Sequence, residues 1–549
     1  MKKKIFIALS LCSVLAACNK YLDMTPRDSI SDKVMWTSVE SAEYAVNSIY
    51  SYSYDIFANW PSAVGLTEAF TDEFKYGSYV NFAYCLIPSQ VAYGGTNLTN
   101  SFVDVYLGCW SSLYEAVRRT NEALSNLKTL GTALPEGDRT RLEGELRLMR
   151  GWLYFELVKR YKEVILYDED LTAISVEKAL SSEADGWKFI KDDLDFAAGV
   201  LPEKASAKGR LDKGAAYALI SRAMLYAGDN DAVIAAANAL EGLGYSLMGD
   251  YASAFTVPVQ SGNPETILQY SFSYADNVTH EFDFYYTPGG DYKLVGQQGG
   301  GYGTPTQEMV ESYELATGGF PDWTPWHGTT TNTPPYELLE PRFKATILYN
   351  GASWKGRTIE PYVGGIDGWA TWKTDKEPKG KTVTGYYLRK LVDESYDVTT
   401  SGSSQPFTFL RYGEVLLNKA EACYRTGDNA GANDAVRAIR DRVGLGYSDK
   451  TGDALWKAIV QERKVELAFE GLRYWDLRRW KTAARNYPEG LSGYQQHGLK
   501  IEKDGDNFRY TYVSVDEKDR NFPERLYRFP MPESELASNA LAEQYDEWK

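Results

Sequence analysis

Two stretches of this chain repeat one pattern, in which a helix-forming run closes on a Gly-Asp-Asn turn and a second run follows at once. Glycine readily ends a helix, and Asp or Asn can cap the next one. The pattern therefore predicts two helical hairpins. Their runs and turns are Ala215–Ala227, Gly228-Asp229-Asn230 and Ala232–Leu240 in the first copy, and Glu414–Thr426, Gly427-Asp428-Asn429 and Ala432–Arg440 in the second.

Helical hairpins of this kind resemble tetratricopeptide units, each of which buries its apolar face on its neighbours. Two copies are too few for a stable array, so other helices have to extend it. Apolar residues recur at helical spacing from Ser38 onward and along Phe102–Leu127, Asp138–Tyr161 and Ala454–Thr482. We therefore expect a mainly α fold, a tetratricopeptide-like helical superhelix.

The residues between the two copies differ in composition. Residues 245–410 are rich in Gly, Pro, Tyr, Trp and Thr, and the tracts Thr287-Pro288-Gly289-Gly290 and Gly299–Gly303 argue against helix. Thr266–Phe272 and Val383–Leu388 are plausible short β elements. The pattern indicates a large loop-rich insertion on a helical scaffold.

These observations give a domain plan. Residues 38–549 are expected to form a single domain. Its parts are a helical scaffold over 38–244 and 411–485, the loop-rich insertion over 245–410, and an irregular C-terminal segment over 486–549.

The N-terminus has the layout of a bacterial lipoprotein signal. Lys2, Lys3 and Lys4 precede the apolar run Ile5–Leu15, and small residues lead to Cys18. The run is shorter than the ~20 apolar residues that span a bilayer. We expect residues 1–17 to be removed, Cys18 to carry lipid, and residues 18–37 to form an extended tether; a plain secretory signal is the alternative.

Charge and scarce residue types exclude several classes of function. The formal net charge is −16, which disfavours nucleic acid as a partner. The three histidines, His280, His327 and His497, have no metal-ligand spacing and are expected to be unrelated. We therefore expect no cofactor and no metal.

The cysteines leave one question open. Beyond Cys18, the chain keeps Cys85, Cys109 and Cys423, which are far apart in sequence. Cys85 and Cys109 could pair, although buried thiols are the default expectation for isolated cysteines.

The longest internal motif runs from Gln461 to Trp480. It predicts two helices hinged at Gly471 with apolar core positions. Its charged residues can form ion pairs between the helices, which we interpret as structural because buried charges must be paired. These residues are Arg463, Glu466, Glu470, Arg473, Asp476 and Arg478.

This string resembles the "ERxxELAFEGxRxxDLxRW" signature of the SusD/RagB family, surface lipoproteins of Bacteroidetes. Gly413 stands where the family usually has Ala, and Arg528-Phe529 where it has Pro-Ile. Similar segments follow the family's order along nearly the whole chain. They are Cys18 with Tyr21-Leu22-Asp23, Arg411–Leu417 with Ala420-Glu421-Ala422, Val436–Arg440 with Val443-Gly444-Leu445, and Leu526–Pro532 with Glu535.

The resemblance implies a function as well as a fold. It implies a non-catalytic outer-membrane lipoprotein at the cell surface. Such a protein captures an oligosaccharide, or in some cases a peptide, and passes it to a SusC-like TonB-dependent transporter. A surface glycoside hydrolase, which needs a pair of carboxylates in an aromatic cleft, and a purely structural protein are the alternatives.

A glycan site needs aromatic faces for sugar C–H groups and polar side chains for hydroxyls. Two groups of loop residues fit this requirement. Trp323 and Trp326 stand out because a polar, Pro-rich stretch would struggle to bury both rings. The candidates are Tyr76, Tyr79, Tyr93 and Asn97 in the first group, and Tyr285, Tyr286, Tyr292, Trp323, Trp326, Trp354, Trp369 and Trp372 in the second.

Overall fold

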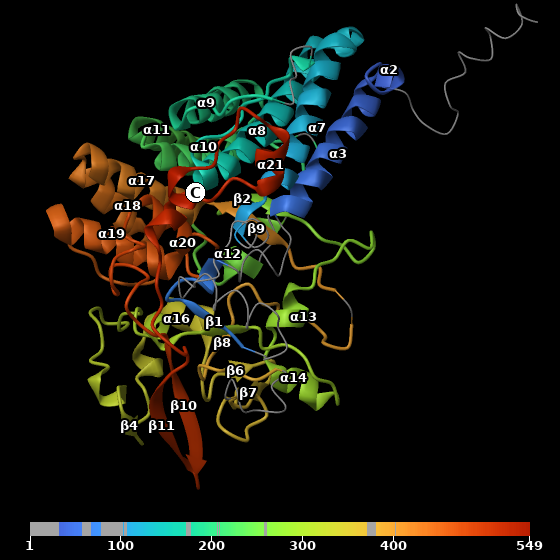
Figure 1. Ribbon diagram of the computed structural model, residues 1–549. Coiled ribbons are helices and arrows are strands. Elements are labelled where there is room, and N and C mark those ends of the chain that lie inside the picture. The colour runs from blue at the N-terminus through green and yellow to red at the C-terminus, as the bar shows by residue number, and fades with distance from the viewer. Residues whose placement is uncertain are drawn as a thin grey trace, which may run out of the picture.

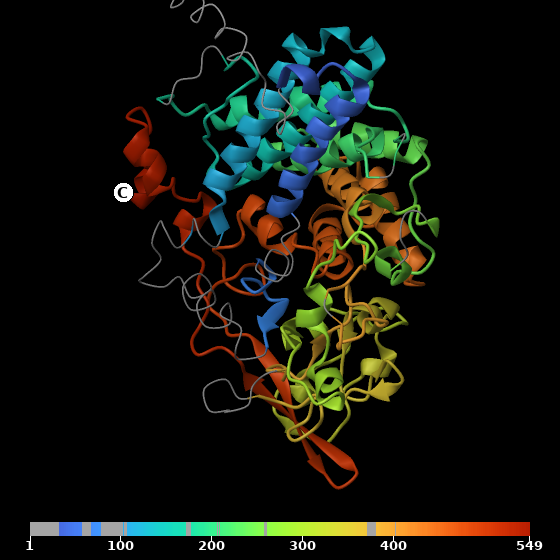
Figure 2. The same cartoon turned by 90° about the vertical axis from the view of Figure 1, so that its right-hand side faces the viewer.

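The computed structural model separates the chain into a helical frame and a loop-rich region. Figures 1 and 2 show the frame at one end of the molecule and the loop-rich region at the other, with a long β-hairpin projecting beyond it. The residues described are 32–57, 67–77, 103, 107–171, 177–205, 207, 209–256, 261–370, 380–400 and 402–549.

The helical frame is a continuous array in which each long helix packs on the next along the chain. Helix α11 packs on α17, so the array continues across the intervening insertion. Within the described residues, no helix combines the length and apolarity needed to cross a membrane. The expected mainly α, tetratricopeptide-like fold is confirmed. The helices are α2 (Asp32–Met35), α3 (Val39–Phe57), α7 (Trp110–Thr129), α8 (Glu136–Tyr161), α9 (Glu183–Val200), α10 (Lys213–Ala227), α11 (Asn230–Gly242), α17 (Tyr412–Thr426), α18 (Asn429–Arg442), α19 (Gly452–Glu466) and α20 (Arg473–Arg479).

Both predicted hairpins turn as the repeated motif requires. Gly228 and Gly427 end α10 and α17 with φ angles of +81° and +85°, a left-handed conformation that suits glycine. The Asp229 carboxylate then accepts a hydrogen bond from the Ala232 amide at 3.1 Å and caps α11. Asp428 caps α18 in the same way. The turn chemistry predicted from sequence is confirmed.

Other helices differ from expectation. Helix α7 begins at Trp110 rather than at residue 102, and the run over 454–482 divides into α19 and α20 around Gly471. Helix α9 was not predicted. Its signal is Ser182, whose hydroxyl accepts a hydrogen bond from the Asp185 amide at 3.1 Å and caps the helix.

One strand pair closes the loop-rich region at its base, where β2 near its start and β9 near its end are antiparallel neighbours. The expected strand over 266–272 is confirmed as β2, and the one over 383–388 shrinks to the two residues of β8. The tract at Gly289-Gly290 was expected not to be helical, yet it begins α14. The strands are β1 (Phe74–Tyr76), β2 (Thr266–Tyr270), β3 (Gly303–Pro305), β4 (Thr329–Thr330), β5 (Ile347–Leu348), β6 (Ser353–Trp354), β7 (Arg357–Thr358), β8 (Tyr387–Leu388) and β9 (Phe407–Arg411), and the short helices are α12 (Ser253–Thr256), α13 (Phe282–Tyr286), α14 (Gly289–Leu294), α15 (Gln307–Val310) and α16 (Pro341–Thr346).

The C-terminal segment is more regular than expected. It contains β10 (His497–Asp504) and β11 (Asn507–Ser514), the longest strands in the described part of the chain, which pair as a hairpin with β4 beside β11. Alternation of polar and apolar residues along both strands was the signal overlooked. The chain then returns to the frame through α21 (Glu533–Ser538), and the Phe529 amide donates to the Arg160 carbonyl at 2.9 Å.

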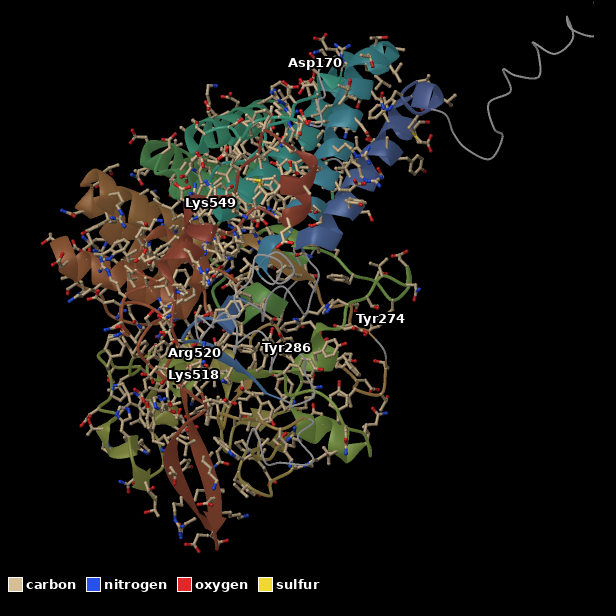
Figure 3. All side chains as sticks on the ribbon, in the orientation of Figure 1. Asp170, Tyr274, Tyr286, Lys518, Arg520 and Lys549 are labelled. Atoms are coloured by element: carbon tan, nitrogen blue, oxygen red, sulfur yellow. The ribbon has the colours of Figure 1, made fainter. Side chains whose placement is uncertain are left out.

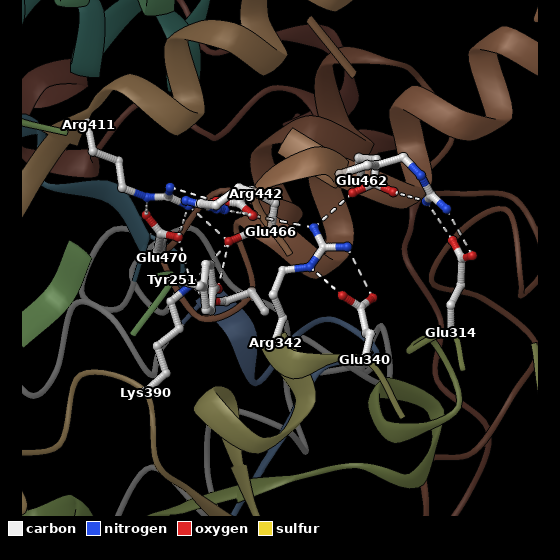
Figure 4. A network of polar contacts seen from close by, with 12 residues as sticks. Tyr251, Glu314, Glu340, Arg342, Lys390, Arg411, Arg442, Glu462, Glu466 and Glu470 are labelled. Carbon is white, nitrogen blue, oxygen red and sulfur yellow. Dashed lines mark hydrogen bonds and ion pairs between the residues drawn. The ribbon is translucent and has the colours of Figure 1, made fainter. Parts of the chain in front are cut away.

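A buried network of charges joins the two regions (Figure 4). Glu466, at the end of α19, binds the guanidinium groups of Arg342 at 3.3 Å, Arg411 at 2.8 Å, and Arg442. Arg342 belongs to α16 of the loop-rich region and also reaches Glu462 at 2.8 Å. Each of these groups is almost completely buried, and each has a partner of opposite charge, as buried charges require.

The ion pairs predicted for the Gln461–Trp480 string form mostly with other elements. Of the six residues predicted to pair, only Arg463 and Asp476 pair with each other, at 2.8 Å, and so join α19 to α20. The string therefore connects the frame to the rest of the molecule, a role wider than pairing its own helices. The other partners are the three arginines above for Glu466, Arg411 and Lys390 for Glu470, Asp72 for Arg473, and the backbone carbonyls of Leu526 and Tyr527 for Arg478.

Candidate functional site

Strand pairing brings the two predicted groups of ligand residues together. β1 pairs with β3 in antiparallel register, so Tyr76 lies opposite Gly303. The Phe74 ring contacts both Tyr76 and Tyr286, with centroids 5.1 Å and 6.3 Å apart. Residues more than 200 positions apart therefore share one aromatic cluster.

Three aromatic side chains of this cluster reach the surface, and we call them the aromatic face: Phe284, Tyr285 and Tyr302. Phe284 is 36% exposed, and the two tyrosines are half-buried. The rings of Tyr285 and Tyr302 lie 4.8 Å apart, and the Tyr302 amide donates to the Tyr285 carbonyl at 3.0 Å. Rings presented side by side in this way can stack on an apolar molecular face while their hydroxyls bond to polar groups.

Glycines set the backbone beneath the aromatic face. A Cβ on Gly289 would lie 1.9 Å from the Gly380 carbonyl oxygen, and one on Gly300 would lie 2.0 Å from the Thr287 carbonyl oxygen. No side chain fits at either position. The Gly-rich tracts therefore let three backbone segments cross in contact and support the residues on both sides.

A buried salt-bridge cluster fixes α14 next to this crossing. Arg357 binds Asp291 at 2.6 Å and Asp367 at 2.7 Å. Asp367 also accepts from the Gly290 amide at 3.0 Å, and the Trp354 indole donates to Asp291 at 2.9 Å. Trp354 is thus a support for the helix and has no exposed surface.

Asp283 lies on α13 between the buried Phe282 and the exposed Phe284. Its carboxylate accepts from the Asp393 amide at 2.6 Å. Burial raises the pKa of Asp283 to about 6, and the hydrogen bonds from Ser403 and Asp393 only partly oppose that rise. The charge of α13 therefore changes in mildly acidic solution.

The predicted ligand residues divide into three groups. Five rings that we expected to be open to a ligand pack in the core, because large apolar faces are buried first: Tyr76, Tyr286, Tyr292, Trp323 and Trp354, each at most 6% exposed. Three are half-buried: Tyr285, Trp326 and Trp369. The remaining four, Tyr79, Tyr93, Asn97 and Trp372, and the lipidation candidate Cys18 lie outside the described residues.

The structure does not bring the two tryptophans of the polar stretch to the aromatic face. Trp323 and Trp326 contact each other edge to face at 5.7 Å, next to β4 and β11. Tyr274, by contrast, is 56% exposed and lies at the periphery of the molecule, whereas Tyr286 lies well inside it (Figure 3).

Sequence reasoning missed Phe284 and Tyr302. Their signal was present: Phe284 lies in the aromatic run of α13, and Tyr302 lies between glycines, where a large ring has few neighbours in sequence to cover it. Neither signal tells which ring of a run faces outward, because α13 is a five-residue helix whose orientation depends on its tertiary contacts.

Two histidines that were expected to be unrelated lie against one tyrosine. The Nδ1 atom of His497 lies within hydrogen-bond distance, 2.6 Å, of a Glu308 carboxyl oxygen, and its ring stacks on that of Tyr512 with the centroids 4.3 Å apart. The His327 ring lies 4.8 Å from the same Tyr512. Across the described ranges, no group of three or more His, Cys, Asp or Glu side chains is placed to hold a metal ion.

Comparison with known proteins gives one consistent family. A model described as the SusD family matches residues 264–548, and a model described as "Starch-binding associating with outer membrane" matches residues 20–225.

Individual relatives cover nearly the whole chain. A SusD-like protein of Bacteroides ovatus is 24% identical over 98% of this chain and 97% of its own length. The crystal structure of a SusD-like protein from Bacteroides fragilis superposes with a TM-score of 0.78 at 30% identity, over 95% of this chain and all of that one. A SusD-like carbohydrate-binding protein of the same species gives a TM-score of 0.73 at 22% identity, over 92% and 99% of the two chains.

Proposed function

The chain belongs to the SusD family, and we propose that it is a lipid-anchored, cell-surface protein that binds an oligosaccharide at the aromatic face. It passes this ligand, uncleaved, to a SusC-like TonB-dependent outer-membrane transporter. The placement of this binding site rests on one observation: the rings of Tyr285 and Tyr302 adjoin at the surface, with their centroids 4.8 Å apart.

The rigidity of the support favours binding at this place. The glycine crossing and the Arg357 cluster hold the backbone on both sides of the rings, so little conformational entropy is lost when a ligand binds. Carbohydrate as the ligand class is supported by the starch-binding description of the matching model and by the carbohydrate-binding relative from Bacteroides fragilis.

A binding role fits the carboxylates beneath the face better than hydrolysis does. Glycoside hydrolysis uses two carboxyl groups that flank the scissile bond. Asp291 and Asp367 are both paired with Arg357, Asp291 is also paired with Lys355 at 3.2 Å, and Asp283 is buried against the Asp393 amide. These three groups hold the fold together and are not free to act on a substrate.

Anchoring rests on the sequence and on the family. Cys18 follows a short apolar run and two alanines, as lipid attachment requires, and the model that matches residues 20–225 is described as associating with the outer membrane. Palmitate labelling of the full chain in its bacterial host, compared with Cys18→Ala, tests this step.

The site is tested by glycan binding to the chain that lacks residues 1–17. A polysaccharide panel identifies the ligand, and calorimetry then compares the variants Tyr285→Ala and Tyr302→Ala. Each should weaken binding by about 2–4 kcal/mol, or roughly 30-fold or more. Trp326→Ala, a half-buried ring elsewhere, is the matched control and should leave affinity unchanged.

The same experiment separates the alternatives. New reducing ends released from the bound glycan would show hydrolysis and refute the binding role. Binding of peptides but of no glycan would refute the ligand class. Full glycan affinity in both tyrosine variants would refute the site.

A further inference from the structure

A cavity of about 150 Å³ lies where the helical frame meets the neck of the loop-rich region. Residues from α8, α10, β9 and α20 line it. It shares no residue with the aromatic face. Its walls include the aromatic rings of Phe155, Phe409 and Trp475 and the cationic groups of Lys159, Arg160 and Arg222.

Three cations surround one of these rings. The Lys159 ammonium lies 4.5 Å from the centre of the Trp475 ring, and the guanidinium carbons of Arg160 and Arg478 lie 4.7 Å and 5.2 Å from it. Ring faces attract cations, but each such contact contributes only about 0.5–2 kcal/mol and supplies no counter-charge.

Among the residues that the structure describes, a single carboxylate balances this group. Glu156 binds Lys159 at 2.7 Å and also binds Arg160. Arg478 is 4% exposed, and its hydrogen bonds in the described chain go to the carbonyl groups of Leu526 and Tyr527. Three positive charges therefore share one negative charge.

The other charged groups that line the cavity are already paired. Arg222 forms a bidentate pair with Glu414, with a shortest distance of 2.6 Å. Glu470 is bound by Lys390 and Arg411, both at 2.7 Å. Neither can neutralise the surplus around Trp475, so the cluster keeps an excess of two positive charges within the described part of the chain.

Burial and the neighbouring positive charges both act on the Lys159 ammonium. Burial, together with the nearby guanidinium groups of Arg160 and Arg222, lowers the pKa of Lys159 to about 7 in spite of Glu156. Like charges held together in a poorly solvated place are unfavourable unless a counter-ion joins them.

We propose that this cavity binds a small oxyanion, either a carboxylate or a sulfate group, which contacts Lys159 and Arg160 in the cavity wall and offsets the surplus positive charge around Trp475. The aromatic walls suit the apolar face of an acidic sugar, and free inorganic sulfate has the same anionic chemistry. The site is independent of the oligosaccharide binding proposed for the aromatic face.

Calorimetry with the chain that lacks residues 1–17 tests the proposal directly. Sodium sulfate and sodium glucuronate are titrated at constant ionic strength, with glucose as the uncharged comparison. We expect one saturable site for sulfate at about pH 6 and at least tenfold weaker binding at about pH 8.5. Sulfate keeps its charge over this range while Lys159 loses its proton.

The outcomes distinguish the sources of the anion. Binding of both sulfate and glucuronate supports a site for acidic sugars, and binding of sulfate alone supports a site for an inorganic anion. No saturable binding by the unaltered chain at about pH 6 overturns the proposal, whatever the variants show.

Two lysine variants check the location. Lys159→Met removes the charge and keeps the length of the side chain, and should weaken sulfate binding at least tenfold and abolish its pH dependence. Lys188→Met, on α9 with a 73% exposed side chain, is the matched control and should bind as the unaltered chain does. Unchanged binding in Lys159→Met, with folding verified by circular dichroism, overturns the assignment.

Discussion

The helical frame and the loop-rich region both contain buried ion pairs, such as Arg222–Glu414 in the frame, but they differ in how much the packing of long apolar helices supports them. In the frame, long helices bury residues such as Leu146, Leu153 and Val158 completely, and neighbouring helices along the chain supply most contacts. In the loop-rich region the strands outside the hairpin are short, and buried ion pairs such as Arg357–Asp291 fix the loops. Apolar packing is non-directional, whereas ion pairs and hydrogen bonds require particular geometry.

This difference shows how an irregular backbone can present a rigid surface. Helices satisfy their own backbone groups, but loops depend on partners from elsewhere in the chain. Here those partners come from α19, from the glycine crossing and from Arg357. The stability of the frame should therefore fall in proportion to the apolar volume removed. The stability of the loop-rich region should fall when a single charge or a single hydrogen bond is lost.

The largest effect is expected at the junction of the two regions. Burial alone would raise the pKa of Glu466, but Arg442, Arg411 and Arg342 bring it below its usual range. Glu466→Ala leaves three buried guanidinium groups without this partner and should cost about 3–5 kcal/mol in urea unfolding. Glu122→Ala, at an exposed pair, is the control and should cost at most about 1 kcal/mol. Equal losses in the two variants would contradict the contrast.

A substitution in the helical frame tests the contribution of apolar packing to its stability. Leu153 is fully buried in α8, and Leu153→Ala should cost about 2–5 kcal/mol through lost burial and a residual cavity. Because no charge is involved, the loss should be the same at low and high salt. A strong salt dependence of this loss, measured by urea unfolding, would contradict a purely apolar contribution of Leu153.

The glycine crossing should respond to a single methyl group. Gly289→Ala places a Cβ 1.9 Å from the Gly380 carbonyl oxygen and should cost about 1–3 kcal/mol. It should also weaken glycan binding, because the aromatic face rests on this backbone. Gly137→Ala, in α8 with nothing within 4 Å of the added Cβ, should stabilise the chain by about 0.5–1 kcal/mol. A melting temperature of Gly289→Ala equal to that of the unaltered chain would refute the tight crossing.

The smallest effect is expected in the pH dependence of folding stability. Burial raises the pKa of Glu68 from 4.5 to about 8, although hydrogen bonds from the Gly471 amide and the Thr67 hydroxyl oppose the shift. The folded state therefore holds this proton more tightly. The resulting stability is fully present below the unfolded pKa and is lost as pH rises through about 8.

Glu68→Gln cannot ionise, so its melting temperature should fall less between about pH 6 and about pH 9 than that of the unaltered chain. Differential scanning calorimetry of both proteins makes the comparison. Identical pH dependence in the two would contradict a buried, protonated Glu68.

Much of the frame could be predicted from local pattern. The Gly-Asp-Asn turns predicted both hairpins because capping acts over a few residues, and α8 begins at Glu136, two residues before the predicted start. Helix α9 and the β10–β11 hairpin were missed although their signals, the Ser182 cap and the alternation along the strands, are also local.

The candidate site could be predicted only in part. The neighbourhood of Tyr285 was identified correctly as aromatic and Gly-rich, but Tyr286 and Trp354 turned inward and Phe284 and Tyr302 outward. Which ring of a run is exposed depends on the pairing of β1 with β3 and on the salt bridges of Arg357, and both join residues far apart in sequence.

Local patterns in the amino-acid sequence were enough to predict the helical array, its turns and its family signature, because helix periodicity and capping involve residues within four positions of one another. Folding alone sets which aromatic rings form a surface, which carboxylates are paired with cations, and where three cations share one carboxylate. Those outcomes depend on burial and on long-range partners, whose free energies exist only once the chain has folded.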